Sequence, residues 1–225
     1  MTGAHLPLLV WLSPAFPVGA FAYSHGLEWA HEAGDVTDAA GLEGWLGDLL
    51  RSGGARNDAV IFAAAYRAVA ESDAAALAEA AELALALATS AERRLETTTQ
   101  GDAFVAAVAN AWPCSAVSFL KSAWPEPVAY PVAVAVAAAG HRLPVAESLE
   151  AFALGFVSNL VSAAVRLGVV GQSDGQRVIA ALLPGVREVA VFAASSTFDD
   201  LGGCAFRSDL AALRHESQYT RLFRS

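Results

Sequence analysis

The chain has 225 residues, of which 55% are hydrophobic and only 16% are charged, and its formal net charge is -9. This length suits one domain, or one domain with an appendage. The acidic excess is scattered, and Lys121 is the only lysine, which argues against a nucleic-acid partner. A mean hydropathy of +0.43 indicates a large Ala-rich core, extra apolar surface for partner proteins, or both.

The sequence carries no convincing targeting or membrane segment, so we expect a cytoplasmic protein. The first 27 residues hold no Asp, Glu, Lys or Arg, but they lack a basic n-region and contain three helix-breaking prolines. The uncharged run 103–120 contains Asn and Pro, and the run 151–165 is short for a span of about 20 residues. Cys114 and Cys204 form no CxxC motif, which fits a reducing compartment.

The first half of the chain has a helical pattern of apolar residues. Helices are expected over residues 25–33, 38–52, 57–72, 73–88 and 89–112. Four residues can cap the starts of the first four helices by accepting hydrogen bonds from free backbone amides, namely Ser24, Thr37, Asn57 and Asp73. In the second helix, four apolar residues at helical spacing should face inward, namely Trp45, Leu46, Leu49 and Leu50. Pro113 should end the fifth helix, because proline lacks an amide donor.

The second half also has a helical pattern. Residues 130–140, "YPVAVAVAAAG", alternate like a strand, but no second strand pattern exists to pair with them, so we expect a buried helix. Residues 145–168 should form a central buried helix. Ser173 and Gln176 fit a capping box that opens a helix, which Pro184 would interrupt or kink before a last core helix over 186–195. The fold class is therefore all-α, a single compact bundle of roughly ten helices.

The end of the chain differs from the rest in charge. Residues 207–225 hold four Arg against one Asp and one Glu, which gives +2 where the remainder carries -11. The turn-forming stretch "FDDLGG", 198–203, precedes this segment. We therefore expect an all-helical domain over 1–200 and a hinge with a C-terminal partner-docking tail over 201–225.

The tail should be mobile or lightly docked in the isolated protein. Ordering its backbone costs more free energy than burial of its few apolar side chains returns, so a partner must add contact area. Tyr219, Leu222 and Phe223 have the spacing of one face of a helical turn. Arg221 and Arg224 flank them and could bind partner carboxylates.

An aromatic-rich stretch near the start, "SPAFPVGAFAYSHGLEWA" at 13–30, has no catalytic template. Its prolines and Gly19 force an irregular path into the first predicted helix. Phe16, Phe21 and Tyr23 are a high density of aromatic side chains for a loop. The stretch either closes the edge of the core or forms a binding surface.

Catalytic motifs are weak throughout. Glu28 and His31 form one Glu-x-x-His, but di-iron bundles need two such pairs and two further Glu, and no second copy exists. No HExxH or GxSxG is present, and Lys121-Ser122 lacks the glycines of a phosphate-binding loop. Ordinary surface residues are therefore the favoured interpretation of the Glu28 and His31 pair. A helical metal-dependent enzyme that uses them stays open as the alternative.

Four segments, spread in order over nearly the whole chain, together resemble the UreF family of urease accessory proteins. They are "SPAFPVGAFAYSHGLEWA" at 13–30, "ERRLETTTQG" at 92–101, "SNLVSAAVRLGVVGQSDGQ" at 158–176 and "LRHESQYTRLFRS" at 213–225. The last is the most specific of the four.

The resemblance implies an all-helical protein without catalytic activity or a cofactor of its own, usually a homodimer. It would bind the accessory protein UreH, also called UreD, and thereby the GTPase UreG, and this assembly would deliver nickel to apo-urease. The candidate partner-binding residues are His215, Glu216, Gln218, Tyr219, Arg221, Leu222, Phe223, Arg224 and Ser225 in the tail, and Pro17, Phe21, Tyr23 and His25 in the N-terminal loop.

Three questions stay open at the level of sequence. The uncharged stretches 103–120 and 130–140 are candidates for a dimer surface, but each could equally be core. Nickel could pass through the subunit along buried polar groups such as Asn159. Arg166 and Gln172 lie in a family-like segment, and ordinary structural roles are the favoured interpretation for both.

Overall fold

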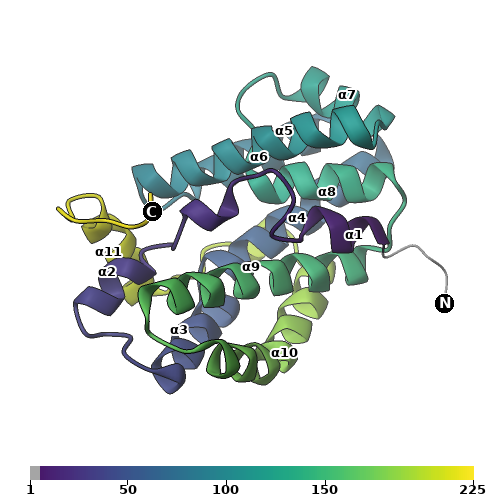
Figure 1. Ribbon diagram of the computed structural model, residues 1–225. Helices are drawn as coiled ribbons and strands as arrows, with labels where there is room; N and C mark the ends of the chain where they lie inside the picture. The colour runs from purple at the N-terminus through teal and green to yellow at the C-terminus, as the bar shows by residue number, and fades with distance from the viewer. Residues whose placement is uncertain (1–5) are drawn as a thin grey trace.

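The computed structural model describes residues 6–225, and within them every regular element is a helix (Figure 1). The all-α prediction is confirmed. The elements are α1 (Leu6–Trp11), η2 (Ala20–Ala22), α2 (Leu27–Glu32), α3 (Ala39–Ser52), α4 (Gly54–Glu71), α5 (Ala74–Ala86), α6 (Ala91–Ala111), α7 (Ser115–Ala123), α8 (Tyr130–Gly140), α9 (Val145–Leu167), α10 (Gln172–Ser195), η3 (Phe198–Asp200) and α11 (Phe206–His215), where η marks a short 3₁₀-helix. The short helices α1 and α7 were not expected from the sequence pattern.

The centre of the bundle is formed by α4 and α8. Helix α8 packs against α4 and α6, and α4 also contacts α3, α5, α9 and α10. All residues from Pro131 to Ala138 are buried, so the prediction of a buried helix over 130–140 is confirmed and this stretch is no surface for a second copy. Helix α9 was expected to be the central one. Instead it lies to one side, packed against α10, with residues such as Ser162 and Arg166 outside the core.

Helix starts differ from the sequence prediction at four places. Helix α2 starts after Gly26, which offers no side-chain cap, although Ser24 Oγ, two residues earlier, accepts from Glu28 N at 3.3 Å. Asp38, one residue after the expected Thr37, caps α3, and its Oδ1 accepts a hydrogen bond from Gly41 N at 2.8 Å. Helix α4 starts at Gly54, so Asn57 lies inside it and donates instead to Gly203 O at 3.1 Å. Helix α10 starts after Gly171, which leaves Ser173 and Gln176 within the helix and no side-chain cap. The cap at Asp73 is confirmed, since Oδ1 accepts from two backbone amides.

Pro184 does not interrupt α10, which runs unbroken from Gln172 to Ser195. Proline removes one hydrogen bond and leaves the carbonyl four residues earlier, that of Ala180, without its helical donor. Ala180 and Pro184 both lie on the exposed side of α10, where water can bind that carbonyl. The predicted separate helix over 186–195 is therefore the second half of α10.

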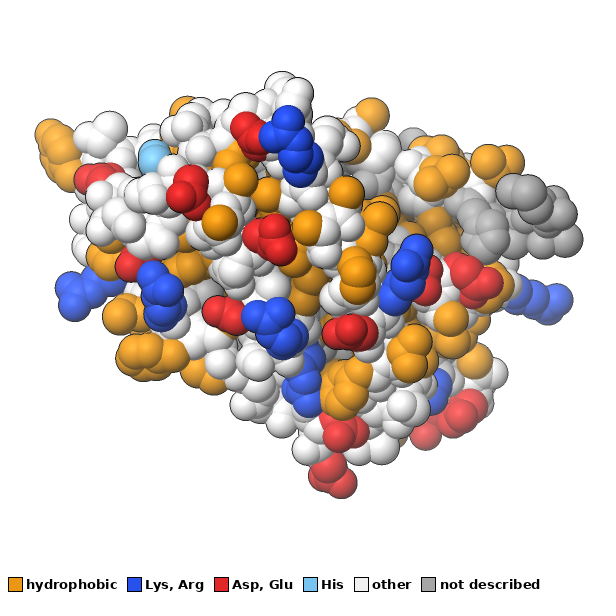
Figure 2. All heavy atoms as spheres, turned by 90° about the horizontal axis from the view of Figure 1, so that it is seen from below, with side chains coloured by type: hydrophobic (Ala, Val, Ile, Leu, Met, Phe, Trp, Pro, Cys, Tyr) orange, Lys and Arg blue, Asp and Glu red, His pale blue; other side chains and the backbone are white. Residues whose placement is uncertain are grey.

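Two helices, α9 and α10, are long and apolar enough to cross a membrane by length and composition, which is weak evidence because bundle helices share both properties. Here they pack against each other, and the outer side of α10 carries Gln176, Arg177, Arg187 and Glu188. On the face in Figure 2, acidic and basic side chains are interspersed with hydrophobic ones. This pattern is that of a bundle whose helices face water on one side.

Trp11 anchors the N-terminal segment in an aromatic cluster. Its ring is fully buried and makes edge contacts with Phe104, Trp112 and His141, at centroid distances of 6.0, 6.1 and 5.2 Å. Phe16 packs on the same cluster. From there the chain crosses the bundle to α2, where the C-terminal segment also lies (Figure 1).

Candidate partner-docking site

The N-terminal loop and the C-terminal tail, singled out separately in the sequence, lie side by side in the structure (Figure 1). Their backbones are joined by two hydrogen bonds, Arg224 N to Ala22 O at 2.8 Å and Ser24 N to Ser225 O at 2.7 Å. The Ser24 hydroxyl donates to the same carbonyl at 2.6 Å. We call this joined region, residues 17–25 with 206–225, the loop–tail surface.

The side chain of Glu28 on α2 binds the backbone of the tail. Its Oε1 accepts from Leu222 N at 2.6 Å, and its Oε2 accepts from Phe223 N at 2.9 Å. The same Oε2 lies 3.2 Å from Nε2 of His215. The residue is only 7% exposed, so two backbone amides of the tail and a ring nitrogen of His215 surround a buried carboxyl group.

The first turn of α6 also binds the tail, through contacts with Glu216, Arg221 and His215. Oε1 of Glu216 accepts from Ala91 N at 2.7 Å, so this carboxylate caps α6, where the helix dipole favours negative charge. Glu92 pairs with Arg221 and lies 2.6 Å from Nδ1 of His215. These contacts fix the tail on two helices that are far apart in the sequence.

Phe223 is the apolar anchor of the tail and is 3% exposed. The guanidinium of Arg166 lies 4.4 Å from the centre of its ring and also donates to Phe21 O. Such stacking of a cation on an aromatic ring is favourable, and more so where water is excluded. Arg166 therefore clamps the loop and the tail together, as the structural interpretation of this residue expects.

The tail beyond α11 is not helical, so the predicted helical face of Tyr219, Leu222 and Phe223 is wrong. Two consecutive amides bind one carboxylate of Glu28, which requires both N–H groups to point the same way. Phe223 therefore turns inward, while Tyr219 is fully exposed and Leu222 is 63% exposed. The outward side chains also include Phe21 of the loop, which is 69% exposed.

Gly26 allows α11 to approach α2 closely. Its φ is +74°, and a Cβ there would lie 2.5 Å from Ala212 N. Ala211 and Ala212 are buried against it, whereas Phe206 and Leu213 on the opposite side of α11 are exposed. The expectation of a mobile or lightly docked tail considered only the burial of its apolar side chains. The hydrogen bonds and ion pairs that join the tail to Glu28 and to α6 stabilise docking in addition.

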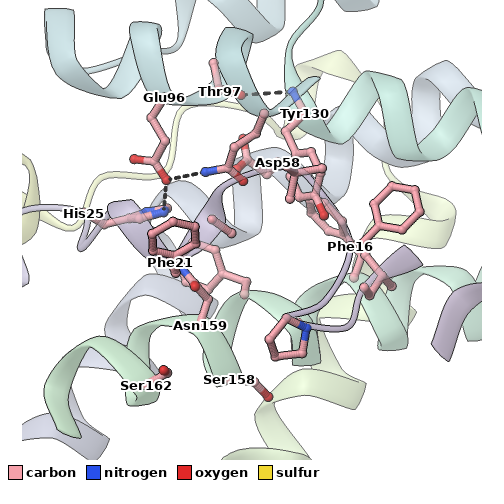
Figure 3. A pocket seen from close by; sticks show the side chains of 18 of the residues that line it. Phe16, Phe21, His25, Asp58, Glu96, Thr97, Tyr130, Ser158, Asn159 and Ser162 are labelled. Carbon is pink, nitrogen blue, oxygen red and sulfur yellow. Dashed lines mark hydrogen bonds and ion pairs between the residues drawn. The ribbon is translucent and has the colours of Figure 1, made fainter. Parts of the chain in front are cut away.

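Glu96 lies beneath the loop–tail surface at the centre of a polar network (Figure 3). It is 1% exposed and contacts His25 Nε2 at 2.7 Å, Gln100 Nε2 at 3.0 Å and Ser225 Oγ at 2.6 Å, and it pairs with Arg93. Burial alone would raise the pKa of Glu96, but Arg93 and the contacts with His25 and Ser225 lower it to about 2. The carboxylate therefore stays ionised inside the protein.

His25 and Tyr23, predicted as partner-binding, face the interior instead of solvent. The His25 side chain is mostly buried against Glu96 and Phe156. Burial lowers the pKa of His25, Arg93 lowers it further, and Glu96 opposes both, so the ring is neutral near pH 7. Pro17 and Phe21 are exposed. Partner binding by these four residues stays a prediction. Tyr23 and His25 would act in it by holding the loop in place and not by touching the partner.

A cavity of about 140 Å³ opens between the N-terminal loop, α6 and α9 (Figure 3). Its apolar wall includes Phe16, Phe21 and Tyr130. Its polar lining includes Asn159, named above for a nickel route, and Asp58. Passage of nickel through this space stays a prediction.

Comparisons of the sequence with known proteins identify its family. A family model described as UreF matches residues 36–183. The chain is similar over 98% of its length to the urease accessory protein UreF of Xanthobacter autotrophicus, at 57% identity and 90% coverage of that protein. The chain belongs to the UreF family.

Further UreF proteins show similar likeness. The chain is 55% identical to one from Rhodopseudomonas palustris, over 97% of this chain and 92% of that protein. It is 53% identical to one from Methylobacterium radiotolerans, over 98% of this chain and 96% of that protein. All three relatives carry the name urease accessory protein UreF, so family membership extends over nearly the full chain.

In this UreF-family protein, Glu28 and His31 do not share a site. Nδ1 of His31 lies 2.9 Å from Val36 O, whereas both oxygens of Glu28 contact the tail. The described residues hold no group of three or more His, Cys, Asp or Glu side chains placed to bind a metal ion. The role of Glu28 as the holder of the tail was missed because its partners are nearly 200 positions away.

Asp58 on α4 is expected to oppose folding above pH 6. Burial raises its pKa to about 6; Arg93 opposes the shift and Glu96 adds to it. Because the folded pKa exceeds the unfolded value of 3.8, folding stability falls as the pH rises from about 4 to about 6. The Asp58→Asn variant should therefore be more stable than the parent at pH 8, by about 3 kcal/mol, and equal to it near pH 4. Urea unfolding at both pH values checks this, with Asp48→Asn as a surface control, and equal stability at pH 8 would contradict it.

Proposed function

We propose that this protein is a non-catalytic scaffold in urease maturation. It binds UreH (UreD) through the loop–tail surface and thereby positions the GTPase UreG, so that nickel is delivered to apo-urease. It acts in the cytoplasm as a homodimer and needs no cofactor of its own. The family relationship supports the link to urease maturation, and the names of the relatives state that they are accessory proteins.

The observation that carries the proposal is the outward composition of the loop–tail surface. Phe21, Tyr219 and Leu222 expose aromatic and apolar side chains, and Arg224 exposes a cation beside them. Aromatic residues and Arg are enriched where protein interfaces gain their binding energy. The buried carboxylates hold the backbone that presents these side chains, which reduces the entropy lost on binding.

Removal of the hinge and tail is expected to abolish partner capture and leave the bundle folded. Tagged full-length protein and a version ending at Asp200 would be used to capture proteins from a urease-producing extract, followed by mass spectrometry. The full chain should retain urease accessory proteins including a GTPase, and the short version should not. Arg177→Ala, an exposed substitution on α10, serves as a full-length control that retains the partners.

Circular dichroism of the short version separates loss of docking from loss of folding. Unchanged helicity per residue with lost capture supports the proposal. Capture of the same accessory proteins by the version ending at Asp200 would exclude the tail as the docking element. Absence of accessory proteins with the full chain would contradict the proposed function itself.

A further inference from the structure

His215 occupies an unusual position at the end of α11. Its side chain is fully buried, and each ring nitrogen faces a carboxylate oxygen. Nδ1 lies 2.6 Å from Oε2 of Glu92 on α6, and Nε2 lies 3.2 Å from Oε2 of Glu28 on α2. Both contacts lie within hydrogen-bond distance.

This arrangement requires one proton beyond the neutral imidazole and two ionised carboxylates. A neutral imidazole carries one N–H and can donate to only one carboxylate. The other ring nitrogen would then place its lone pair against a carboxylate oxygen, at a side chain that is fully buried. Whichever of the three groups holds the additional proton, the docked cluster binds one proton more than its separated members do at pH 8.

The other donors around the cluster indicate that the imidazole holds this proton. Glu28 already accepts from two backbone amides, and Glu92 already accepts from Arg221, so both carboxylates serve as acceptors and the imidazole is the group placed to donate on each side. With His215 as imidazolium, its charge and that of Arg221 balance Glu28 and Glu92. With neutral imidazole, the buried cluster keeps an unbalanced negative charge, which is costly in the interior.

We propose that docking of the tail is linked to uptake of a proton at His215, so that the loop–tail surface is assembled at low pH and released as the pH rises. Free histidine titrates near about pH 6.5, so the undocked tail loses this proton above that value. The docking equilibrium should then weaken by up to about tenfold for each further pH unit.

Further charged groups lie on the elements packed around the cluster, and of these Arg221 contacts it directly. They are Arg221 and Glu216 in the tail, Arg93 and Glu96 on α6, Glu32 on α2, and His25 in the loop. Among these, His25 is the second histidine, and burial, with Arg93, lowers its pKa. Its own proton is therefore already absent over the range in which the tail is expected to be released.

The proton linkage acts on the loop–tail surface, and its use in the cell rests on the proposed function of that surface, the binding of UreH. The linkage itself does not depend on that function, because the isolated chain contains every group involved. Partner capture can therefore fail while the proton linkage holds, and the reverse. A buried histidine between two carboxylates is one of the few arrangements that makes a protein contact sensitive to pH between 6 and 8.

Hydrogen exchange of the full-length protein between pH 6 and pH 9 tests the proposal. The amides of Leu222 and Phe223, which bind Glu28, report docking. Their protection, corrected for the intrinsic rate at each pH, should fall by up to about tenfold per unit above about pH 6.5. Amides of the buried helix α8 should keep their protection and serve as the internal reference.

Three variants assign the effect to His215. His215→Gln has no titrating ring and should remove the pH dependence, while His141→Gln, far from the tail, should retain it. Glu92→Gln supplies an amide donor to the neutral ring and should keep the tail docked at pH 8. Protection of Leu222 and Phe223 that is constant from pH 6 to pH 9, absent throughout, or equally pH-dependent in His215→Gln would overturn the proposal.

Discussion

The Glu28→Gln variant is expected to lose the docked tail and, with it, the capture of UreH, while the bundle stays folded. Glutamine has nearly the same size, but one of its terminal groups is a donor and would face the amide of Leu222 or Phe223. The variant therefore replaces a carboxylate with three donors by a neutral group that leaves one buried donor unpaired. Breaking such a buried contact costs about 3 kcal/mol, which corresponds to a docking equilibrium weakened more than about 100-fold.

The measurement is capture of UreH by the variant and by a matched control, Glu32→Gln. Glu32 lies on the same helix and also binds the tail, but its contact with Gln218 is exposed and should contribute little. A folded Glu28→Gln protein that captures UreH as well as the parent would exclude Glu28 as the support of the docking surface. An equal loss of UreH capture in Glu32→Gln would show that capture depends on the negative charge of α2 and not on the contacts of Glu28 with the tail backbone.

Much of the fold could be predicted because local patterns determine it. Residues 130–140 were assigned to a helix although they alternate like a strand, because Pro131 suits a first helical turn and no partner strand exists. The four apolar residues predicted to face inward on α3 are all buried, namely Trp45, Leu46, Leu49 and Leu50. Such assignments succeed because spacing on one helix does not depend on distant residues.

Exact helix starts were less predictable, since neighbouring residues compete for the same role. Thr37 and Asp38 can both cap a helix, and the aspartate has the longer reach and the charge that favours a helix start. Asn57 was assigned as a cap, but its amide contacts Gly203 from the hinge. That tertiary contact has no signal in the local sequence.

The two unusual stretches of the site were found from the sequence, but the residues that join them were not. The tail differs in charge and the loop in aromatic content, and both are local properties. Glu28, Glu92 and Glu96 look like ordinary helix-surface acids in the sequence, because the tail residues that they contact lie more than 120 positions away. Charge inversion was the one available signal, since a positive tail on a negative body predicts contacts such as the ion pair of Arg207 with Asp35.

The Gly101→Ala variant is expected to destabilise the whole bundle and not only the docking surface. A Cβ at this position in α6 would lie 1.9 Å from Val128 O, in the segment that leads into α8. That segment is fixed to α6 on both sides, by Val128 N to Asp102 at 3.0 Å and Tyr130 N to Thr97 at 3.1 Å. The clash can be relieved only by moving α8, the most buried helix, away from α6. We expect a loss of at least about 3 kcal/mol in the free energy of unfolding.

Urea unfolding of Gly101→Ala and of Gly44→Ala distinguishes this steric cause from a general effect of removing glycine. Gly44 lies exposed inside α3, and an added Cβ there meets no atom within 4 Å. The Gly44 variant should therefore gain about 0.5–1 kcal/mol from helix propensity. Gly101 also lies inside a helix, so its replacement by Ala should bring the same gain in helix propensity. A net loss of folding stability in Gly101→Ala therefore measures the steric clash with Val128. Stability of Gly101→Ala at or above that of the parent would mean that α8 does not pack on α6 as described.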